Sequence, residues 1–212
     1  YDSLHYLFFT KKTLYMIVFD MSRILHDEDH VDNELMLLES WIERVVIYAE
    51  ENGQISPILL VGTHYDKLEG NDEVIATLES KINEKLKSLI ESIKVKTKID
   101  IDKAIITPSS SVCDAIYFAV DNINSENREV FNNIIHSMEH SLENASHVQQ
   151  KVLLAWIACC DDFLRKAMDD KIVSLTLEEA GKVMESYGVA SKDVLKALAF
   201  FHEMGVLFWL DR

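Results

Sequence analysis

The chain has 212 residues, of which 48% are hydrophobic, so it can build a packed core in one large domain or two small ones. The formal net charge of −15 disfavours binding to the phosphate backbone of nucleic acids. Six glycines and two prolines exclude collagen-like and linker-rich chains. No two glycines have the G-x-x-x-x-G-K-[ST] or G-x-G-x-x-G spacing, so the chain contains no glycine-rich phosphate-binding loop of either kind.

The cysteine content and the hydropathy pattern bear on the compartment. Three cysteines, two of them adjacent at Cys159 and Cys160, do not form a disulfide framework, so we expect a reducing, cytoplasmic environment. The adjacent pair is expected to pack in a core. No apolar run approaches the roughly 20 residues of a membrane-spanning helix, so we expect no transmembrane segment. The chain starts at Tyr1 and enters an apolar stretch at once, which leads us to expect a piece of a longer protein.

The first predicted element is a strand at residues 14–20, a run of aromatic and β-branched residues that we expect to be buried on both faces. The acidic residues 26–34 follow, and we expect a solvated loop and helix start there. A metal site formed by His26 and His30 is an alternative for this segment. Apolar residues at three- and four-residue spacing then predict a helix from Leu38 to Ala49.

The middle of the chain repeats this alternation of strand and helix. Residues 57–62 predict a second buried strand, and Asn71 is a candidate N-cap for a helix whose apolar face runs to Ile90. The lysines at positions 94, 96 and 98 predict a solvated edge or loop. Residues 104–107 predict a third strand. The pattern indicates a parallel α/β sheet, whose ligands bind outside the carboxyl ends of the strands.

Three segments follow the predicted strands at those carboxyl ends. They are Asp20, the Thr63-His-Tyr-Asp66 quartet and the serine cluster 109–111. A carboxylate such as Asp66 accepts hydrogen bonds from the ring N–H and the exocyclic amine of guanine, which adenine cannot supply. The quartet therefore favours a guanine-reading loop.

The last third of the chain is predicted to be mostly helical. Helices are expected at residues 126–146 and 152–167, and Thr176 with Glu179 forms a capping box for a third. Ser191 is expected to cap a fourth helix that ends at Gly205, before a strand-like run at residues 206–210. This helix–helix–strand pattern is similar to a winged helix. Its presumptive recognition helix has only two lysines, at positions 192 and 196, which favours protein contacts over DNA.

Taken in order, these motifs resemble the Roc–COR (Roco) family, which includes the leucine-rich-repeat kinases. Residues 1–8 and 14–20 resemble the end of switch II and the following strand of a Roc domain, and residues 61–66 match its T-H-x-D form. Residues 198–208 resemble the start of COR. The resemblance implies a partial Ras-like, P-loop GTPase sheet with flanking helices at residues 1–146. A mostly helical, winged-helix-like COR segment would follow at residues 147–212.

The resemblance also implies a set of site residues. Asp66 would read guanine, Thr63 and His64 would brace the base and the loop, and Ser109 and Ser110 would lie in the last base-contacting loop. The P-loop, the switch I threonine, the Mg²⁺ aspartate and the DxxG motif would precede Tyr1. No catalytic residue and no metal ligand is therefore predicted in this chain.

The expected function follows from that division. The intact parent would bind GTP or GDP with Mg²⁺ and act as a GTPase in signalling. This piece is expected to bind nucleotide weakly and to hydrolyse none. COR would supply protein partners, with a homodimer as one option.

Two alternatives remain open at this point. One is a nucleotide-independent Roc–COR scaffold or interaction module. The other is a zinc hydrolase, because His136, Glu139 and His140 match the H-x-x-E-H pattern on a predicted helix.

Overall fold

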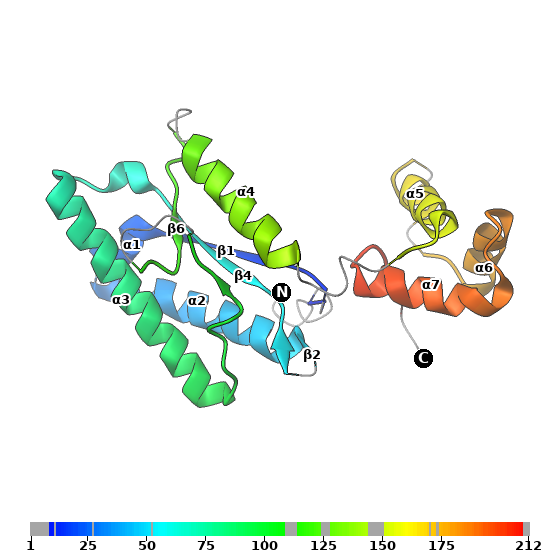
Figure 1. Cartoon of the computed structure of the whole chain (residues 1–212), viewed down its shortest axis with the longest axis horizontal. Helices are drawn as coiled ribbons and strands as arrows, with labels where there is room; N and C mark the ends of the chain where they lie inside the picture. The colour runs from blue at the N-terminus through cyan, green and yellow to red at the C-terminus, as the bar shows by residue number, and fades with distance from the viewer. Residues whose placement is uncertain are drawn as a thin grey trace. The chain divides into compact units, whose positions relative to one another are not determined.

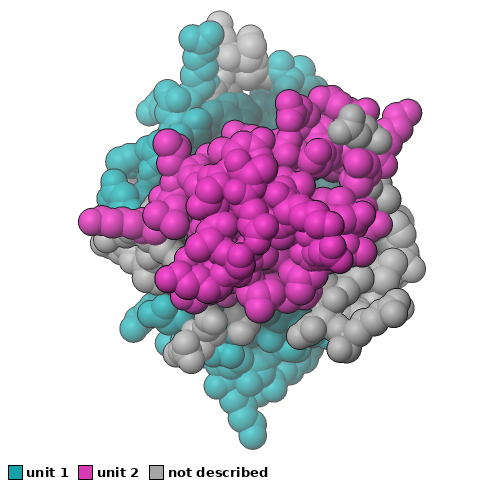
Figure 2. All heavy atoms as spheres, turned by 90° about the vertical axis from the view of Figure 1, so that its right-hand side faces the viewer, with its two compact units in different colours: residues 1–148 teal, residues 149–212 magenta. Residues whose placement is uncertain are grey.

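The computed structural model describes residues 9–10, 12–26, 28–51, 53–108, 114–123, 128–143, 151–169, 171–172 and 174–209. These residues form a mixed α/β structure with a small parallel sheet and many helices, so the predicted α/β class is confirmed (Figure 1). The chain divides into two compact units, residues 1–148 and 149–212 (Figure 2). Every helix within the described residues is too short or too polar to span a bilayer.

The sheet of the first unit is built around β4 (Ile58–Thr63). On one side β4 pairs in parallel with β1 (Tyr15–Asp20) over its whole length. On the other side it pairs in parallel with two short strands, β5 (Ile105–Ile106) and then β6 (Phe118–Ala119). All the pairings of β4 are thus parallel, and its carboxyl end lies beside the carboxyl ends of β1 and β6.

Helices cover both faces of this sheet (Figure 1). The short helix α1 (Met21–His26) follows β1 directly and leads to α2 (Glu28–Tyr48). These two helices pack with α3 (Asp72–Thr97) over the face of the sheet that carries Phe19 and Leu60. Helix α4 (Arg128–Glu143) packs on the opposite face against residues of β4, β5 and β6. The sheet therefore separates two hydrophobic clusters.

Helix α3 begins where the sequence predicts. The Asn71 side chain accepts a hydrogen bond from the Val74 amide at 3.0 Å and caps the first turn. The predicted apolar face is confirmed from the middle of the helix onward, where Ile82, Leu86 and Ile90 are buried.

The prediction that β1 is buried on both faces is wrong. Met16 and Val18 are 49% and 55% exposed, whereas the neighbouring Phe19 is buried. The reason is position, because β1 pairs only with β4 among the described strands and so lies at the edge of the sheet. Helix α4 packs on β4, β5 and β6 and leaves this part of the face open. A groove of about 370 Å³ lies along this edge.

The expectation of a solvated edge or loop at the three lysines is also wrong. Lys94 and Lys96 lie in the last turns of α3, and Lys98 follows them as the left-handed C-cap. The Lys94 ammonium lies 2.7 Å from Glu91 and 2.7 Å from Asp102, and Lys96 pairs with α2. These ion pairs and the favourable position of cations at a helix C-terminus extend α3 beyond the predicted end.

The sequence analysis missed three short strands. A two-stranded antiparallel hairpin, β2 (Glu50–Glu51) and β3 (Gln54–Ile55), follows α2 and turns at Gly53, where φ is 81°. The third is β6. Each strand has only two residues, which is too short for a periodic pattern to develop.

The described residues of the second unit form three helices, α5 (Leu154–Met168), α6 (Leu177–Ser186) and α7 (Ser191–Glu203). The predicted capping box at the start of α6 is confirmed, since Thr176 and Glu179 bond to each other's backbone amides. Cys159 lies in the core formed by these helices and Cys160 packs against it, so both act as packing residues. Both thiols are free.

Two expectations for this unit are wrong. Ser191 is the first residue of α7 rather than its cap, and its hydroxyl bonds to Glu185 instead. Within the described part of residues 206–210 there is no strand, because the chain turns back at Gly205 and packs Val206 and Leu207 against the helices. The described residues of this unit therefore contain no strand that could form the wing of a winged helix.

Candidate functional site

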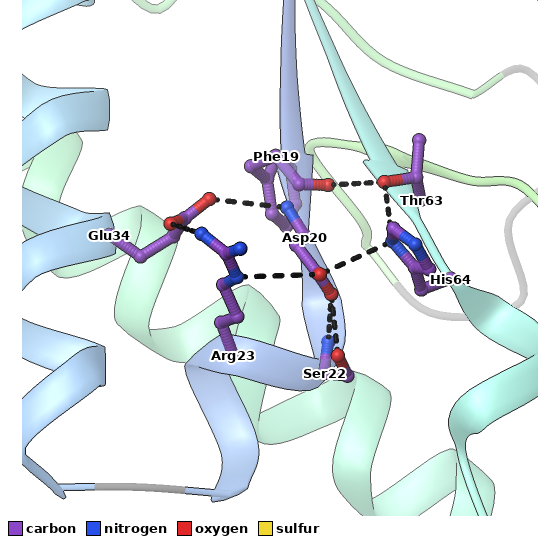
Figure 3. Close-up of polar contacts among 7 residues, drawn as sticks. All are labelled: Phe19, Asp20, Ser22, Arg23, Glu34, Thr63 and His64. Carbon is purple, nitrogen blue, oxygen red and sulfur yellow. Dashed lines mark hydrogen bonds and ion pairs between the residues drawn. The ribbon is translucent and has the colours of Figure 1, made fainter.

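The carboxyl ends of β1 and β4 meet because the two strands are parallel and in register. Asp20, the last residue of β1, is the register partner of Thr63, the last residue of β4. Polar side chains from both strands and from the helices that follow β1 gather at this point (Figure 3). The structure therefore brings together two of the three predicted strand ends.

The Asp20 carboxylate is the centre of the cluster and is only 16% exposed. Its Oδ1 accepts hydrogen bonds from the backbone amide and the hydroxyl of Ser22, at 2.9 and 2.6 Å. Its Oδ2 lies 3.3 Å from Nδ1 of His64. Burial raises the pKa of the Asp20 carboxyl, but the hydrogen bonds from Ser22 and the charges of His64 and Lys67 outweigh burial, so the pKa lies below its usual value.

An outer group of charges braces Asp20. The Nε atom of Arg23 lies 3.6 Å from Oδ2 of Asp20, and its Nη1 atom lies 3.7 Å from Oε2 of Glu34. Glu34, from α2, also accepts a hydrogen bond from the Asp20 amide at 3.3 Å. The strand end is thereby tied to both helices that follow it.

Thr63 joins the two strands at their ends. Its hydroxyl donates a hydrogen bond to the carbonyl oxygen of Phe19 at 3.0 Å. The hydroxyl oxygen of Thr63 also lies 3.2 Å from Nδ1 of His64. His64 has left-handed backbone angles, φ 63° and ψ 37°, which are unfavourable for a residue with a side chain. This conformation turns the chain sharply out of β4.

Asp66 lies in the turn that follows, the short 3-10 helix η2 (Tyr65–Lys67). The turn is closed by hydrogen bonds from the Lys67 amide to His64 and from the Leu68 amide to Tyr65, at 3.1 and 3.0 Å. Leu68 is buried and anchors the turn to the core. The Asp66 side chain is exposed and forms no hydrogen bond or ion pair with the residues that the structure describes. A carboxylate without a partner is thus presented on an ordered turn.

Ser109 and Ser110 lie outside the described residues, so their place at the site stays a prediction. The segment that does reach β4 beside Thr63 is the end of β6. The Val120 amide donates to Gly62 at 2.8 Å, and the Val120 carbonyl accepts from Tyr65 at 3.3 Å. The sequence analysis missed this segment, although residues 116–121 repeat the apolar run ending in aspartate that identified β1.

The bracing residues Ser22, Arg23 and Glu34 were also missed. An aspartate that bonds to the amide two residues later is a common turn, so the Asp20-Met-Ser22 spacing carries a usable signal. Arg23 and Glu34 come from different helices, and their meeting depends on how α1 and α2 fold back on each other. No local pattern encodes that contact.

The zinc-hydrolase alternative has no support in the described part of the chain. His136, Glu139 and His140 lie on α4 with exposed side chains, and His140 pairs with Glu143 at 3.6 Å. Among the described residues there is no group of three histidine, cysteine, aspartate or glutamate side chains that could hold a metal ion. The alternative metal site at His26 and His30 involves side chains outside the described set.

Gly62, next to Thr63, is packed so closely against buried side chains that there is no room for a larger residue. A Cβ added there would lie 2.6 Å from Cγ of Met21 and 3.0 Å from Cζ of Phe19, both of which are buried. We expect Gly62→Ala to lower the free energy of unfolding by about 1–3 kcal/mol through overpacking. Urea unfolding followed by circular dichroism measures this change.

Gly181→Ala is the matched control. A Cβ at Gly181 would meet no atom within 4 Å, and alanine stabilises the interior of α6 relative to glycine. Equal stability of Gly62→Ala and the unmodified chain would contradict the tight packing behind the site.

Comparisons of the chain with protein-family models, with curated proteins and with solved structures gave no match. The observations that bear on function are therefore the geometry of the strand ends and the sequence motifs that lie there.

Proposed function

We propose that this chain contains the guanine-reading part of a Roc-like, Ras-like GTP-binding domain, followed by the beginning of a COR-like segment. The observation that carries the proposal is the Asp66 carboxylate, exposed and without a described partner at the carboxyl end of a parallel sheet. That is the edge at which such sheets bind ligands. Two adjacent N–H donors, as guanine has, are the ligand groups that suit this carboxylate.

The rigidity of the turn supports this proposal. Thr63 ties the end of β4 to β1, and the buried Leu68 holds the other end of the turn. A turn whose backbone is held in this way loses little backbone conformational entropy when a ligand binds. The buried Val120, at the end of β6, bonds through its backbone to Gly62 and Tyr65 and so holds the start of the turn.

The phosphate end of a nucleotide has no matching motif in the sequence and no matching group among the residues that the structure describes. The sequence has no P-loop spacing, and the described residues include no acidic or histidine group that fits Mg²⁺. The proposed role of this chain in a GTP-binding protein is recognition of the base.

The test compares the affinities of the chain for different nucleosides. The affinities are measured from NMR chemical-shift changes of the isotope-labelled 212-residue chain during titration. We expect guanosine to bind better than inosine, which lacks the exocyclic amine, and better than adenosine. Asp66→Asn should weaken guanosine binding by about 10- to 100-fold, because a hydrogen bond to a charged group contributes roughly 1.5–3 kcal/mol. Xanthosine, which has a carbonyl oxygen in place of the amine, should bind Asp66→Asn better than the unmodified chain.

Glu69→Gln is the matched control, since Glu69 is an exposed acid three residues further along and its loss removes the same charge. It should leave the guanosine preference unchanged. An unmodified chain that does not distinguish guanosine from inosine and adenosine contradicts the proposal. Tight binding of GDP that depends on Mg²⁺ would contradict the division of the site described above.

A second candidate is a nucleotide-independent interaction module. Helix α5 leaves a row of apolar side chains exposed at helical spacing, and such surfaces are commonly covered by protein partners. The row comprises Leu154, Ile157, Leu164 and Met168. A folded, unmodified chain that shows no preference for guanosine over the other nucleosides would favour this candidate over the first.

A further inference from the structure

His64 has an imidazole ring whose two nitrogens lie in different surroundings (Figure 3). Nδ1 faces Oδ2 of Asp20 at 3.3 Å and the hydroxyl oxygen of Thr63 at 3.2 Å. Nε2 has no hydrogen-bond partner among the residues that the structure describes, and the side chain is 41% exposed. The ring is therefore held from one side and open on the other.

The protons at this contact can be counted. A threonine hydroxyl has one proton, and the Thr63 proton is committed to the carbonyl oxygen of Phe19, which can only accept. The Thr63 oxygen is therefore an acceptor toward His64. The Asp20 carboxylate is also an acceptor, and both of its oxygens are already oriented by Ser22 and Arg23. Two acceptors face Nδ1, so Nδ1 must carry the proton.

We infer that Asp20 and Thr63 hold the His64 ring, whenever it is neutral, as the Nδ1–H tautomer and that Asp20 is a positioning residue for the base-reading loop. His64 then presents an unprotonated Nε2, a hydrogen-bond acceptor, on its open side. The ligand class that suits this arrangement has a donor group at that point, such as a hydroxyl or an N–H. Two residues further on, Asp66 is also an acceptor, so both side chains select for donors.

The tautomer does not depend on the proposed function, whereas the identification of the donor as part of a guanine nucleoside rests on it. Asp20 acts through His64 and through the left-handed turn that His64 begins. Holding the ring from Nδ1 also restrains the residue whose carbonyl closes η2. The same contact thus sets the chemistry of Nε2 and the direction of the loop.

The test is a long-range ¹H–¹⁵N correlation spectrum of the histidine rings in the 212-residue chain, at a pH where they are neutral. His64→Gln identifies the His64 signals by removing them. We expect a protonated Nδ1 and an unprotonated Nε2. Asp20→Asn keeps an oxygen for Ser22 and can place an amide N–H toward Nδ1. We expect this variant to move His64 toward the Nε2–H tautomer.

Glu69→Gln and Asp66→Asn are the controls and should leave the tautomer unchanged. A protonated Nε2 in the unmodified chain overturns the inference, and so does an Asp20→Asn variant that retains Nδ1–H. The unmodified chain decides the first point even if Asp20→Asn fails to fold.

Guanosine titration supplies the second measurement. Asp20→Asn should weaken binding by a few-fold to tenfold, because a donor then replaces the acceptor that faces the ligand. Equal affinity of this variant and the unmodified chain overturns the role of Asp20 in ligand binding. Absence of guanosine binding altogether contradicts the proposed function, while the spectrum still decides the tautomer.

Discussion

Replacement of Phe201 by alanine is expected to lower the free energy of unfolding of the second unit by about 3–5 kcal/mol. Phe201 is almost completely buried between the helices, with its ring 6.3 Å from that of Phe163 and 5.9 Å from that of Phe200. The described residues of the unit form one small core, and small domains have a small free energy of unfolding because they bury little surface. Urea unfolding, with hydrogen exchange of peptides from α5 and α7, measures the loss and locates it.

Leu195→Ala is the control for this change, because Leu195 lies on the same helix and is half exposed. We expect a loss below about 1 kcal/mol, in line with other surface substitutions. Similar losses for the two variants would show that the described packing of α7 is incorrect.

The second large effect is expected from Leu60→Ala in the first unit. Leu60 is fully buried in the centre of β4, where it packs in the cluster that α2 and α3 cover. Removing its side chain leaves a cavity behind the strand that carries Thr63 and His64. We expect a loss of about 2–5 kcal/mol in the free energy of unfolding, measured by urea unfolding and by hydrogen exchange of peptides from β4.

Val18→Ala on the neighbouring edge strand is the matched control. Val18 pairs in register with Val61, but its side chain is 55% exposed, so its truncation should cost less than about 1 kcal/mol. If Val18→Ala is as damaging as Leu60→Ala, the exposed edge of β1 is covered in solution, and the description of that edge must change.

The dependence of the site on β4 connects stability with function. The strand positions Thr63, and Thr63 holds both the end of β1 and the ring of His64. Core variants are therefore expected to disturb ligand binding indirectly. Asp66→Asn differs from them, because it should change nucleoside preference while leaving the free energy of unfolding within about 0.5 kcal/mol of the unmodified value.

Much of the fold could be predicted because local signals agreed with the final structure. The apolar runs found β1 and β4, Asn71 marked the start of α3, and Thr176 with Glu179 marked the start of α6. Each of these signals is a hydrogen bond or a burial pattern formed within a few residues. The location of Asp66 at a strand end follows from the same kind of signal.

Contacts between distant segments were harder to predict. The two-residue strands β5 and β6 both pair with the same edge of β4, and each is too short for its extent to be read from the sequence. The exposure of Met16 and Val18 depends on which strands and helices lie next to β1. The length of α3 depends on the ion pairs that Lys96 forms with Glu39 and Glu43 of α2.

The sequence by itself determined that this is an α/β chain with a helical second part and that the Thr63-His-Tyr-Asp66 quartet follows a buried strand. Only the tertiary structure showed that Asp20 faces His64, since the two lie on different strands and meet only because β1 and β4 are parallel and in register. It also separated the roles of the quartet, with Thr63 and His64 bonded into the sheet and Asp66 exposed. Local sequence patterns reflect hydrogen bonds and burial within one segment. The position of the proton on His64 depends instead on Asp20, an acceptor that the fold brings from another strand.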